Sequence, residues 1–291
     1  MTNSGNWIVP YKERVNSVLE SLLPDDGSIL TKATRYSVLN GGKRLRPLLV
    51  YLSSELGNST NESQDLVSCA VELIHCYSLI HDDLPSMDDD SLRRGLPTCH
   101  KKFGEAIAIL AGDALQPMAY SLLTHSNEIE DKLKVKLVAL LSRACGQNGM
   151  VEGQMLDISA GNKSLSLEEL DYMHSKKTGS LIKTCLEMGG LISYLQINDI
   201  DLLKEYGEKI GLAFQIRDDI IDLESPSEVS GKTQGADVLN QRVTYPKVIG
   251  MEASKKRAIE LCKEAQEILT NLSGDPVKFI KLSNFISNRR Y

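Results

Sequence analysis

Residues 66–84, LVSCAVELIHCYSLIHDDL, are the most direct indication of the fold. Apolar side chains recur here at steps of three and four residues, which is the period of a helix with one buried face. The members of this series are Leu66, Ala70, Leu73, Tyr77, Ile80 and Leu84. Pro85 follows and disfavours helical geometry at Leu84, so we expect the helix to end there and turn its aspartates away from the core.

Most of the remaining chain shows the same period. The helical segments predicted in this way are Val15–Leu23, Ala106–Leu123, Lys132–Cys145, Leu167–Tyr194, Ile200–Leu223 and Ser254–Leu272. Ser166 and Glu169 have the spacing of a capping box at the start of one of them. Aromatic residues are only 5% of the chain and no sustained run alternates as a strand would, so the prediction is an all-α protein. Without a repeat or a break in composition, residues 1–291 are expected to form one domain.

The overall charge excludes some classes of partner. The 291 residues carry a net charge of −6, whereas broad binding to nucleic acid or to an anionic membrane needs a basic surface. The six cysteines form no CxxC pair, which favours reduced, buried thiols. Residues 1–10 lack a basic segment followed by an apolar run, and no 18-residue apolar stretch occurs. A soluble, cytoplasmic protein without stable membrane insertion is therefore expected.

Two clusters of aspartate stand at the ends of apolar segments. The first is Asp82-Asp83-Leu84-Pro85-Ser86-Met87-Asp88, and the second is Asp218-Asp219-Ile220-Ile221-Asp222. Asp218 and Asp222 are four residues apart, hence about 6 Å apart on one helix face. A solvated acidic helix end is the alternative for either cluster alone, but like charges at this density need a cation. Carboxylate oxygens without cysteine favour Mg²⁺, so the two clusters together predict one metal–phosphate site between facing helices.

Basic residues lie in short glycine-marked motifs around these clusters. The motifs are Gly41-Gly42-Lys43-Arg44-Leu45-Arg46-Pro47, Arg93-Arg94-Gly95, Lys177-Thr178-Gly179 and, within the polar stretch Glu224–Thr244 that we expect to be a lid, Lys232. Arginine forks and mobile lysines suit diphosphate, although each residue alone could be an ordinary surface cation. His75 lies two helical turns before Asp82 and is either a core histidine or part of the same site. His81, next to Asp82, is expected either to be structural or to support the residues of the site without binding the ligand itself.

Taken together, these motifs resemble the trans-isoprenyl diphosphate synthases, the polyprenyl synthetase family, and most closely its bacterial farnesyl diphosphate synthases. The segments that carry the resemblance are GGKRLRP (41–47), HDDLPSMDDDSLRRG (81–95), KTG (177–179), FQIRDDIID (214–222) and GKTQGAD (231–237). They follow one another in order between Lys32 and Tyr245. The resemblance implies an all-helical isoprenoid-synthase bundle around a central active-site cavity, usually as a homodimer.

The resemblance also implies a role for each motif residue. Three Mg²⁺ ions, bridged by the allylic diphosphate, would be held by Asp82, Asp83, Asp88, Asp218 and Asp222. The diphosphate of dimethylallyl or geranyl diphosphate would be bound by Arg93, Lys177, Thr178, Gln215 and Lys232. Isopentenyl diphosphate would be bound by Lys43, Arg46, His75 and Arg94. Lys177, Thr178 and Gln215 would stabilise the allylic cation, with Arg93 supporting departure of the diphosphate, so that no protein nucleophile is needed.

Product length is expected to depend on the residues just before the first aspartate. Tyr77 and Ser78 stand where the family forms the floor of the tail pocket, and Tyr77 favours the fifteen-carbon product, (E,E)-farnesyl diphosphate. The smaller Ser78 leaves geranyl and geranylgeranyl diphosphate open. Departures from the family pattern are Glu152, which places the Gln154–Asp157 region in doubt, and Arg242. The tail Arg289-Arg290-Tyr291 is expected to help close the isopentenyl site.

Three other functions are compatible with part of the sequence. A terpene cyclase shares the fold but would lack Lys43 and Arg46 for a second diphosphate. A metal-dependent phosphohydrolase would use His75 and the His81-Asp82 pair, but it leaves the second acidic cluster and the paired arginines unexplained. A non-catalytic subunit of a heteromeric synthase would normally lose one acidic cluster, and both are present here.

Overall fold

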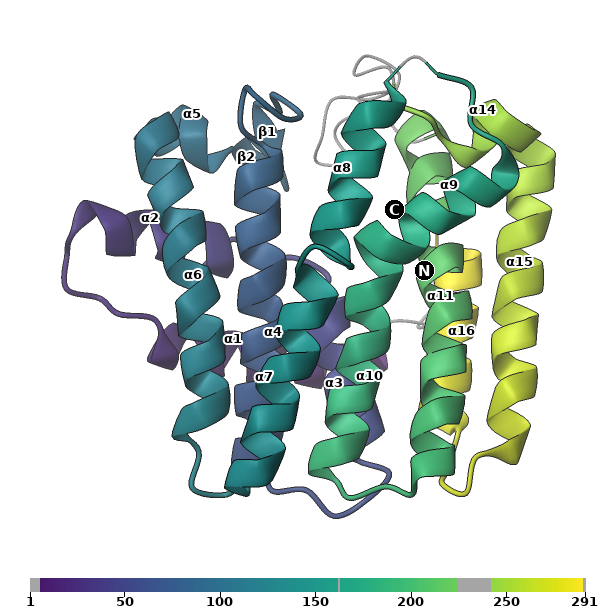
Figure 1. Ribbon diagram of the computed structural model, residues 1–291, viewed down its shortest axis with the longest axis horizontal. Coiled ribbons are helices and arrows are strands. Elements are labelled where there is room, and N and C mark those ends of the chain that lie inside the picture. The colour runs from purple at the N-terminus through teal and green to yellow at the C-terminus, as the bar shows by residue number, and fades with distance from the viewer. Residues whose placement is uncertain (1–5, 162, 225–241, 290–291) are drawn as a thin grey trace.

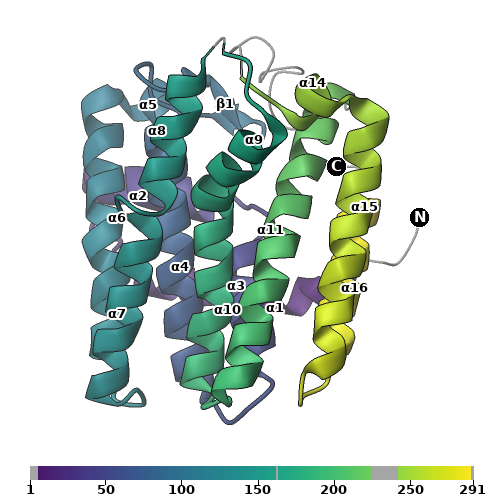
Figure 2. The ribbon, with the colours of Figure 1, turned by 45° about the vertical axis from the view of Figure 1, so that its right-hand side comes forward.

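The computed structural model describes residues 6–161, 163–224 and 242–289, and these form a bundle of helices (Figure 1). Most long helices run side by side along one direction, as Figures 1 and 2 show for α4, α6, α7, α10, α11 and α15. In chain order, the α-helices are α1 Val9–Leu22, α2 Ile29–Leu39, α3 Leu45–Ser54, α4 Asn61–Asp82, α5 Cys99–Phe103, α6 Glu105–His125, α7 Asp131–Cys145, α8 Met150–Ala160, α9 Leu167–His174, α10 Ser180–Ile192, α11 Ile197–Glu224, α14 Tyr245–Ile249, α15 Met251–Ile268 and α16 Val277–Asn288. The all-α prediction is confirmed.

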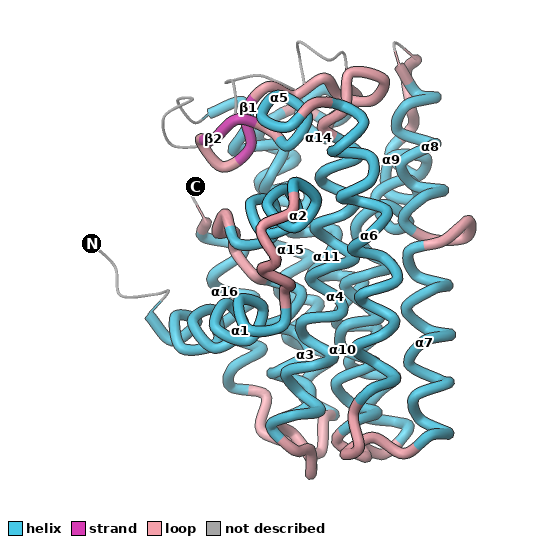
Figure 3. Tube along the Cα trace, turned by 90° about the vertical axis from the view of Figure 1, so that its left-hand side faces the viewer, coloured by secondary structure: helices cyan, strands magenta, loops and turns pink. Residues whose placement is uncertain are grey.

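Helices α4 and α11 form the centre of the bundle. α4 packs mainly against α6 and α3, while α11 packs against α15 and α10. Apart from the half-buried Leu79, the apolar side chains of α4 between Val67 and Ile80 are almost completely buried, because neighbouring helices cover α4 on several faces. α1 and α2 cross the bundle instead of following it (Figure 3). All six cysteines are buried free thiols, as expected.

Both acidic clusters lie at the same end of the bundle. α4 ends at Asp82, two residues earlier than Pro85 led us to expect, and Asp83 is its C-cap. The chain then folds back over the helix end, where the Asp88 N–H donates to the carbonyl of Asp82 at 2.9 Å. α11 runs upward in Figure 1, ends at Glu224 and packs against α14.

A short antiparallel hairpin follows the first cluster and was not predicted. Its strands β1 Leu92–Arg93 and β2 Leu96–Pro97 have two residues each, too few to show an alternating pattern. Gly95 has a φ of 77° at the turn, a conformation that glycine adopts without strain. The hairpin presents Arg93 and Arg94 next to the end of α4.

The predicted helix Leu167–Tyr194 is three elements in the structure. α9 ends at His174, the π-helical turn η2 spans Ser175–Gly179, and α10 begins at Ser180. The capping box at Ser166 and Glu169 is confirmed, with both of its hydrogen bonds formed. Two short 3₁₀ helices, η1 Asn6–Ile8 and η3 Leu269–Asn271, complete the described elements.

One described helix, α6, is long and apolar enough to cross a membrane by length and composition, with a mean hydropathy of 1.3 over its most apolar window. Only 39% of that window is buried within the chain. Ile109 and Leu110 are 44% and 53% exposed on this helix, and Val135 on the adjacent α7 is 71% exposed. α6 and α7 therefore present an apolar outer face.

Candidate active site

Asp82, the last residue of α4, has a carboxylate suited to binding a cation. Burial raises its pKa to about 6, with Asp88 raising it further while Lys177 opposes the shift. Among the described residues, no hydrogen bond reaches this carboxylate. A half-buried acid with an elevated pKa and open acceptor oxygens gains from a nearby positive charge.

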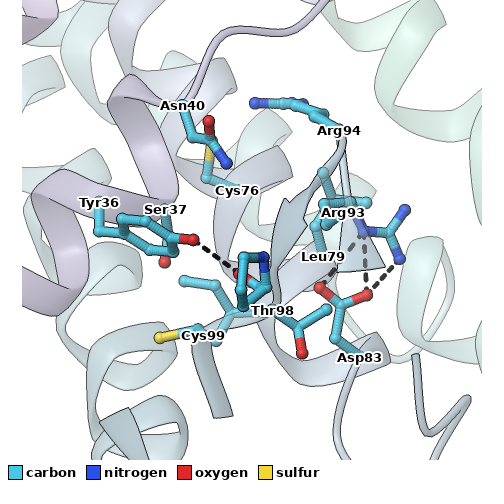
Figure 4. A pocket seen from close by; sticks show the side chains of 12 residues that line it. Tyr36, Ser37, Asn40, Cys76, Leu79, Asp83, Arg93, Arg94, Thr98 and Cys99 are labelled. Carbon is cyan, nitrogen blue, oxygen red and sulfur yellow. Dashed lines mark hydrogen bonds and ion pairs between the residues drawn. The ribbon is translucent and has the colours of Figure 1, made fainter. Parts of the chain in front are cut away.

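Asp83 lies on the other side of the helix end and is 3% exposed. Its carboxylate accepts from Arg93 Nε at 2.9 Å and from a second nitrogen of the same guanidinium, as Figure 4 shows. Arg93 also donates to Asp90 at 3.2 Å. The hairpin thus fixes Arg93 with its charge balanced by two aspartates. Arg94 extends away from Asp83 in the same view and donates to the carbonyl of Gly41.

A cavity of about 30 Å³ lies between α2, the end of α4 and the hairpin (Figure 4). Tyr36, Cys76, Asp83 and Thr98 are among the side chains that line it. This volume accommodates roughly one water molecule and no substrate. Arg93 and Asp83 line the cavity, whereas none of its lining residues belongs to the second acidic cluster.

Asp88 and Asp157 each form an ion pair with a cation of the chain. Arg242, noted above as a departure from the family pattern, pairs with Asp88. Lys177 Nζ donates to Asp157 on α8 at 2.5 Å. Burial raises the pKa of Asp157, but Lys177 and Arg242 outweigh it, so the net pKa is lowered. Asp157 was not assigned a role from the sequence; its helical spacing from Gln154 was the only available signal.

The π-helical turn η2 places Lys177 and Thr178 toward the interior of the site. α8 packs directly on this turn at Gly153, where an added Cβ would lie 2.1 Å from the Lys177 amide nitrogen. Thr178 is 8% exposed, and its hydroxyl donates to Gln215 Oε1 on α11 at 3.1 Å. Glu152, one of the departures from the family pattern, pairs with Lys176 of the same turn at 3.2 Å.

Asp218 of the second cluster is also surrounded by cations. Lys43 Nζ donates to it at 3.3 Å, and Arg289 after α16 donates to it as well. Burial raises the pKa of Asp218, but Arg289 and Lys43 reverse this effect and the net pKa is lowered. Asp222 lies one turn further along α11 and is partly buried. Arg289 reaches the second acidic cluster, whereas Arg290 and Tyr291 lie outside the described residues.

Three of the predicted isopentenyl diphosphate ligands surround a cationic region with unused hydrogen-bonding groups. Arg46 Nε and His75 Nδ1 are both buried without a partner among the described residues. Burial, together with Arg46 and Arg94, holds the pKa of His75 well below its usual value, so its imidazole is neutral. These groups suit an anionic ligand. Lys43 lies beside them, with its ammonium 5.3 Å from the Phe214 ring centre.

Arg44, between Lys43 and Arg46, is a residue that sequence reasoning missed. It has a left-handed φ of 53° and forms a fully buried ion pair with Glu72 of α4 at 2.5 Å. Its Nε donates to Asn16 at 2.9 Å. This contact anchors the turn before α3 to the core and leaves its neighbours directed toward the site. The sequence alone did not distinguish the structural arginine from the ligand-binding ones.

Tyr77 and Ser78 lie on α4 below Asp82. Tyr77 is 6% exposed and meets the His81 ring edge to face, with ring centres 5.8 Å apart. The Ser78 hydroxyl donates to the carbonyl of His75 at 2.9 Å. Tyr77 is therefore a rigid, bulky side chain one helical turn below the first acidic cluster. Lys232 and most of the predicted lid lie outside the described residues.

The donor set fits Mg²⁺, but the carboxylates are not gathered around a common point. Among residues 6–161, 163–224 and 242–289, no three Asp, Glu, His or Cys side chains come together at metal-binding distance. Several of these acids are paired with cations of the chain instead: Asp88 with Arg242, Asp157 with Lys177, and Asp218 with Lys43 and Arg289. The residues present are hard oxygen donors with lysines and arginines close by, a combination that suits a metal ion together with a diphosphate.

A helical bundle with two aspartate clusters and interleaved cations at one end defines a class of metal-dependent diphosphate enzymes. The chain belongs to the polyprenyl synthetase family, whose model matches residues 27–273.

Its relatives are prenyl diphosphate synthases by name. The chain is 42% identical to the farnesyl diphosphate synthase of Haemophilus influenzae over 95% of each chain, and 44% identical to that of Escherichia coli over 86% of this chain and 85% of the relative. A geranylgeranyl pyrophosphate synthase of Arabidopsis thaliana is 41% identical over 98% of this chain and 78% of the relative.

Solved structures resemble the whole described fold. A geranyltransferase from Legionella pneumophila superposes with a TM-score of 0.87 at 35% identity, covering 98% of this chain and 97% of that one. A geranyltransferase from Helicobacter pylori, in complex with magnesium and isoprenyl diphosphate, has a TM-score of 0.85 at 33% identity, covering 99% and 97%.

Proposed function

We propose that this chain condenses isopentenyl diphosphate head to tail with dimethylallyl and then geranyl diphosphate, giving (E,E)-farnesyl diphosphate for isoprenoid biosynthesis. The observation that carries the proposal is that two aspartate clusters on different central helices lie at the same end of the bundle, with cations from other elements paired to Asp88 and Asp218. Membership of the polyprenyl synthetase family supports it.

The aspartates of both clusters would hold Mg²⁺, with three ions as the family pattern implies. Asp82 is the best-suited ligand because its carboxylate is open and its pKa is raised. Asp88, Asp218 and Asp222 would join it once Arg242, Lys43 and Arg289 shift toward the bound phosphates. Asp83 would support the metal site indirectly, because it holds Arg93 in place. When bound, Mg²⁺ neutralises the charge that develops on the leaving diphosphate.

The side chains of the protein then have distinct tasks at the allylic substrate. Arg93, Lys177 and Lys232 bind its diphosphate and stabilise the negative charge that grows as the carbon–oxygen bond breaks. The carbonyl and hydroxyl oxygens of the π-helical turn, with Gln215, face the resulting allylic cation. The double bond of isopentenyl diphosphate attacks that cation, and the proton lost from its C2 passes to the departing diphosphate.

The second substrate would be bound by the cationic region around His75. Arg46 and His75 have unused, buried hydrogen-bonding groups that a diphosphate would satisfy. Lys43 and Arg94 add charge at its edges. A terpene cyclase needs no such second diphosphate region, which favours the synthase.

The product is proposed to stop at fifteen carbons. Tyr77 is bulky and fully packed below Asp82, with Ser78 beside it on the helix. The farnesyl diphosphate synthases among the relatives agree with this length. The geranylgeranyl synthases at 40–41% identity keep the twenty-carbon product as the alternative, with the ten-carbon product the remaining option.

We further propose that residues 1–291 act as a single domain in a soluble, cytoplasmic homodimer. The exposed apolar side chains on α6 and α7 support this assembly, because apolar surface is costly to leave in water. A second copy of the chain would cover Ile109, Leu110 and Val135.

The deciding experiment is an assay of the purified chain with Mg²⁺, dimethylallyl diphosphate and labelled isopentenyl diphosphate, with chain length read by chromatography. A fifteen-carbon product supports the whole proposal, whereas a ten- or twenty-carbon product keeps the reaction and rejects the argument from Tyr77. No condensation by a folded, metal-replete sample would reject the proposal in favour of a non-catalytic subunit. Release of inorganic phosphate without condensation would indicate a phosphohydrolase.

A further inference from the structure

Asp219, the second aspartate of the DDIID segment, differs from Asp218 in its surroundings. Asp219 is 2% exposed and lies inside the packed face of α11. Its Oδ1 accepts from Gln215 Nε2 at 2.9 Å, and its Oδ2 accepts from the Tyr245 backbone N–H at 3.0 Å. Both carboxylate oxygens therefore have a donor within the protein.

This contact determines which way the Gln215 amide points. A carboxylate only accepts hydrogen bonds, so the NH₂ group of Gln215 must face Asp219. The carbonyl oxygen of the same amide is then on the opposite side, where it accepts from the Thr178 hydroxyl at 3.1 Å. Reversing the amide would direct its positive end toward the π-helical turn.

The other oxygen of Asp219 is held by a rigid partner. Tyr245 is completely buried, its hydroxyl donates to Asp171 at 2.7 Å, and its ring stacks on His174 with centres 5.5 Å apart. His174 is the last residue before the π-helical turn that carries Thr178. A series of contacts therefore leads from the turn to α11 and back to the turn. It runs through Thr178, Gln215, Asp219, Tyr245 and His174.

We propose that Asp219 is a positioning residue that directs the carbonyl oxygen of Gln215 toward the allylic cation. The inference rests on the proposed prenyl transfer and assigns the two adjacent aspartates different tasks. Asp218 faces the metal–diphosphate site, whereas Asp219 sets the direction of a dipole. Electrostatic stabilisation of a cation depends on such prior orientation, because a reversed amide would destabilise the same charge.

The test exchanges the two partners. In Asp219→Asn, the one oxygen left on residue 219 must serve the fixed Tyr245 N–H, so the new NH₂ group faces Gln215 and reverses its amide. We expect kcat to fall by roughly ten- to a hundredfold, with the KM of both substrates and the Mg²⁺ dependence close to wild type. The double variant Gln215→Glu/Asp219→Asn restores an oxygen toward Thr178 and keeps the net charge, so it should recover at least about tenfold of the lost kcat.

A matched control is available on the same helix. Asp199 is 6% exposed and accepts the Ser273 N–H at 2.9 Å, but it lies at the opposite end of α11. Asp199→Asn should therefore change stability without changing kcat. If Asp219→Asn does not fold, Thr178→Val and Thr178→Ser test the same chain, because only serine keeps the hydroxyl that meets Gln215.

Several outcomes would overturn the inference. A positioning role is rejected if Asp219→Asn has the kcat of the wild type, or if excess Mg²⁺ restores its lost kcat. It is also rejected if the double variant is no more active than Asp219→Asn. Equal kcat in Thr178→Val and Thr178→Ser would reject it as well. Absence of any prenyl product from the wild-type chain would instead remove the proposed function itself, and this inference with it.

Discussion

The buried ion pair between Arg44 and Glu72 shows how a single residue can support a site without facing it. Both side chains are 1% exposed, and Arg44 also donates to the carbonyl of Val38. The energy of such a pair is offset by the cost of removing two charges from water. Its main effect is therefore geometric, since it anchors the left-handed backbone of Arg44 between Lys43 and Arg46.

Removal of one partner should be far more costly than removal of both. Glu72→Gln leaves the Arg44 charge buried and uncompensated, and we expect the free energy of unfolding to fall by about 3–5 kcal/mol. The double variant Arg44→Met/Glu72→Met should lose much less. Urea unfolding of the three proteins measures both differences, and equal losses in the single and double variants would contradict the argument.

The buried imidazole of His174 should make stability depend on pH. Burial is the main cause that lowers its pKa, to about 3, while its unfolded value is about 6.5. Above pH 6.5 its contribution is complete. As pH falls below this value, His174 binds a proton in the unfolded chain but not in the folded chain. The free energy of unfolding therefore falls by about 1.4 kcal/mol per pH unit, until His174 also becomes protonated in the folded chain.

In His174→Gln, the free energy of unfolding should depend less steeply on pH between pH 6 and pH 4. The expected decrease in slope is about 1.4 kcal/mol per pH unit, which corresponds to one proton. Urea unfolding at several pH values measures the slope in both proteins. His75, whose pKa is also lowered by burial, leaves part of the dependence in place. His125→Gln is the control because His125 is exposed, and a change of slope in the control but not in His174→Gln would refute the assignment.

The first aspartate of each cluster is expected to matter most for activity. Asp82→Ala or Asp218→Ala should reduce turnover by at least about a hundredfold, because each removes a negative group that faces the diphosphate site. Circular dichroism should show unchanged helicity, since neither residue is part of the apolar core. Activity near the wild-type value in either variant would reject the metal assignment.

At the scale of elements, the π-helical turn η2 is the feature that most directly serves the site. It interrupts what would otherwise be one helix from α9 to α10, and such turns frequently occur at functional positions. Because the turn widens the helix, the backbone of Lys177 comes close to α8. Only glycine at position 153 allows this approach.

Gly153→Ala should therefore displace the turn. The new methyl group would lie 2.1 Å from a backbone nitrogen that cannot rotate away, so we expect a loss of about 1–3 kcal/mol and a lower kcat. Thermal unfolding and the condensation assay measure the two effects. Ser159→Ala, an exposed substitution on the same helix, is the control, and a Gly153→Ala protein with unchanged kcat would show that the position of Lys177 is not critical.

At the scale of the whole molecule, the outer face of α6 and α7 is the main feature that the single chain leaves unexplained. Most other apolar side chains of α6 are covered by α4 and α2. Ile109 and Leu110 project away from these neighbours. A second copy of the chain would bury them.

Ile109→Lys should convert the proposed homodimer into a monomer, because it places a charge in an apolar contact. Size-exclusion chromatography with light scattering measures the mass directly. Ile259→Lys on α15 is the matched control, since both isoleucines are 44% exposed. A wild-type monomer, or equal dissociation by both variants, would contradict an interface on α6.

The sequence by itself determined the helical class and most of the chemistry. The spacing of apolar residues in α4 and α11 is local, and two aspartate clusters at their ends are visible without coordinates because Pro85 and the charges interrupt each apolar run. The capping box at Ser166 was predictable for the same reason. Its hydrogen bonds join residues only three positions apart.

Only the tertiary structure decided which charged residues meet. Arg44 and Arg46 are indistinguishable in the motif, yet Arg44 is paired with Glu72, whereas the buried Nε of Arg46 has no partner in the part of the chain that the structure describes. Lys177 with Asp157, and Asp219 with Tyr245, join residues that are 20 and 26 positions apart. Local periodicity contains no information about such pairs, because they depend on how helices pack and on which partner a buried charge finds there.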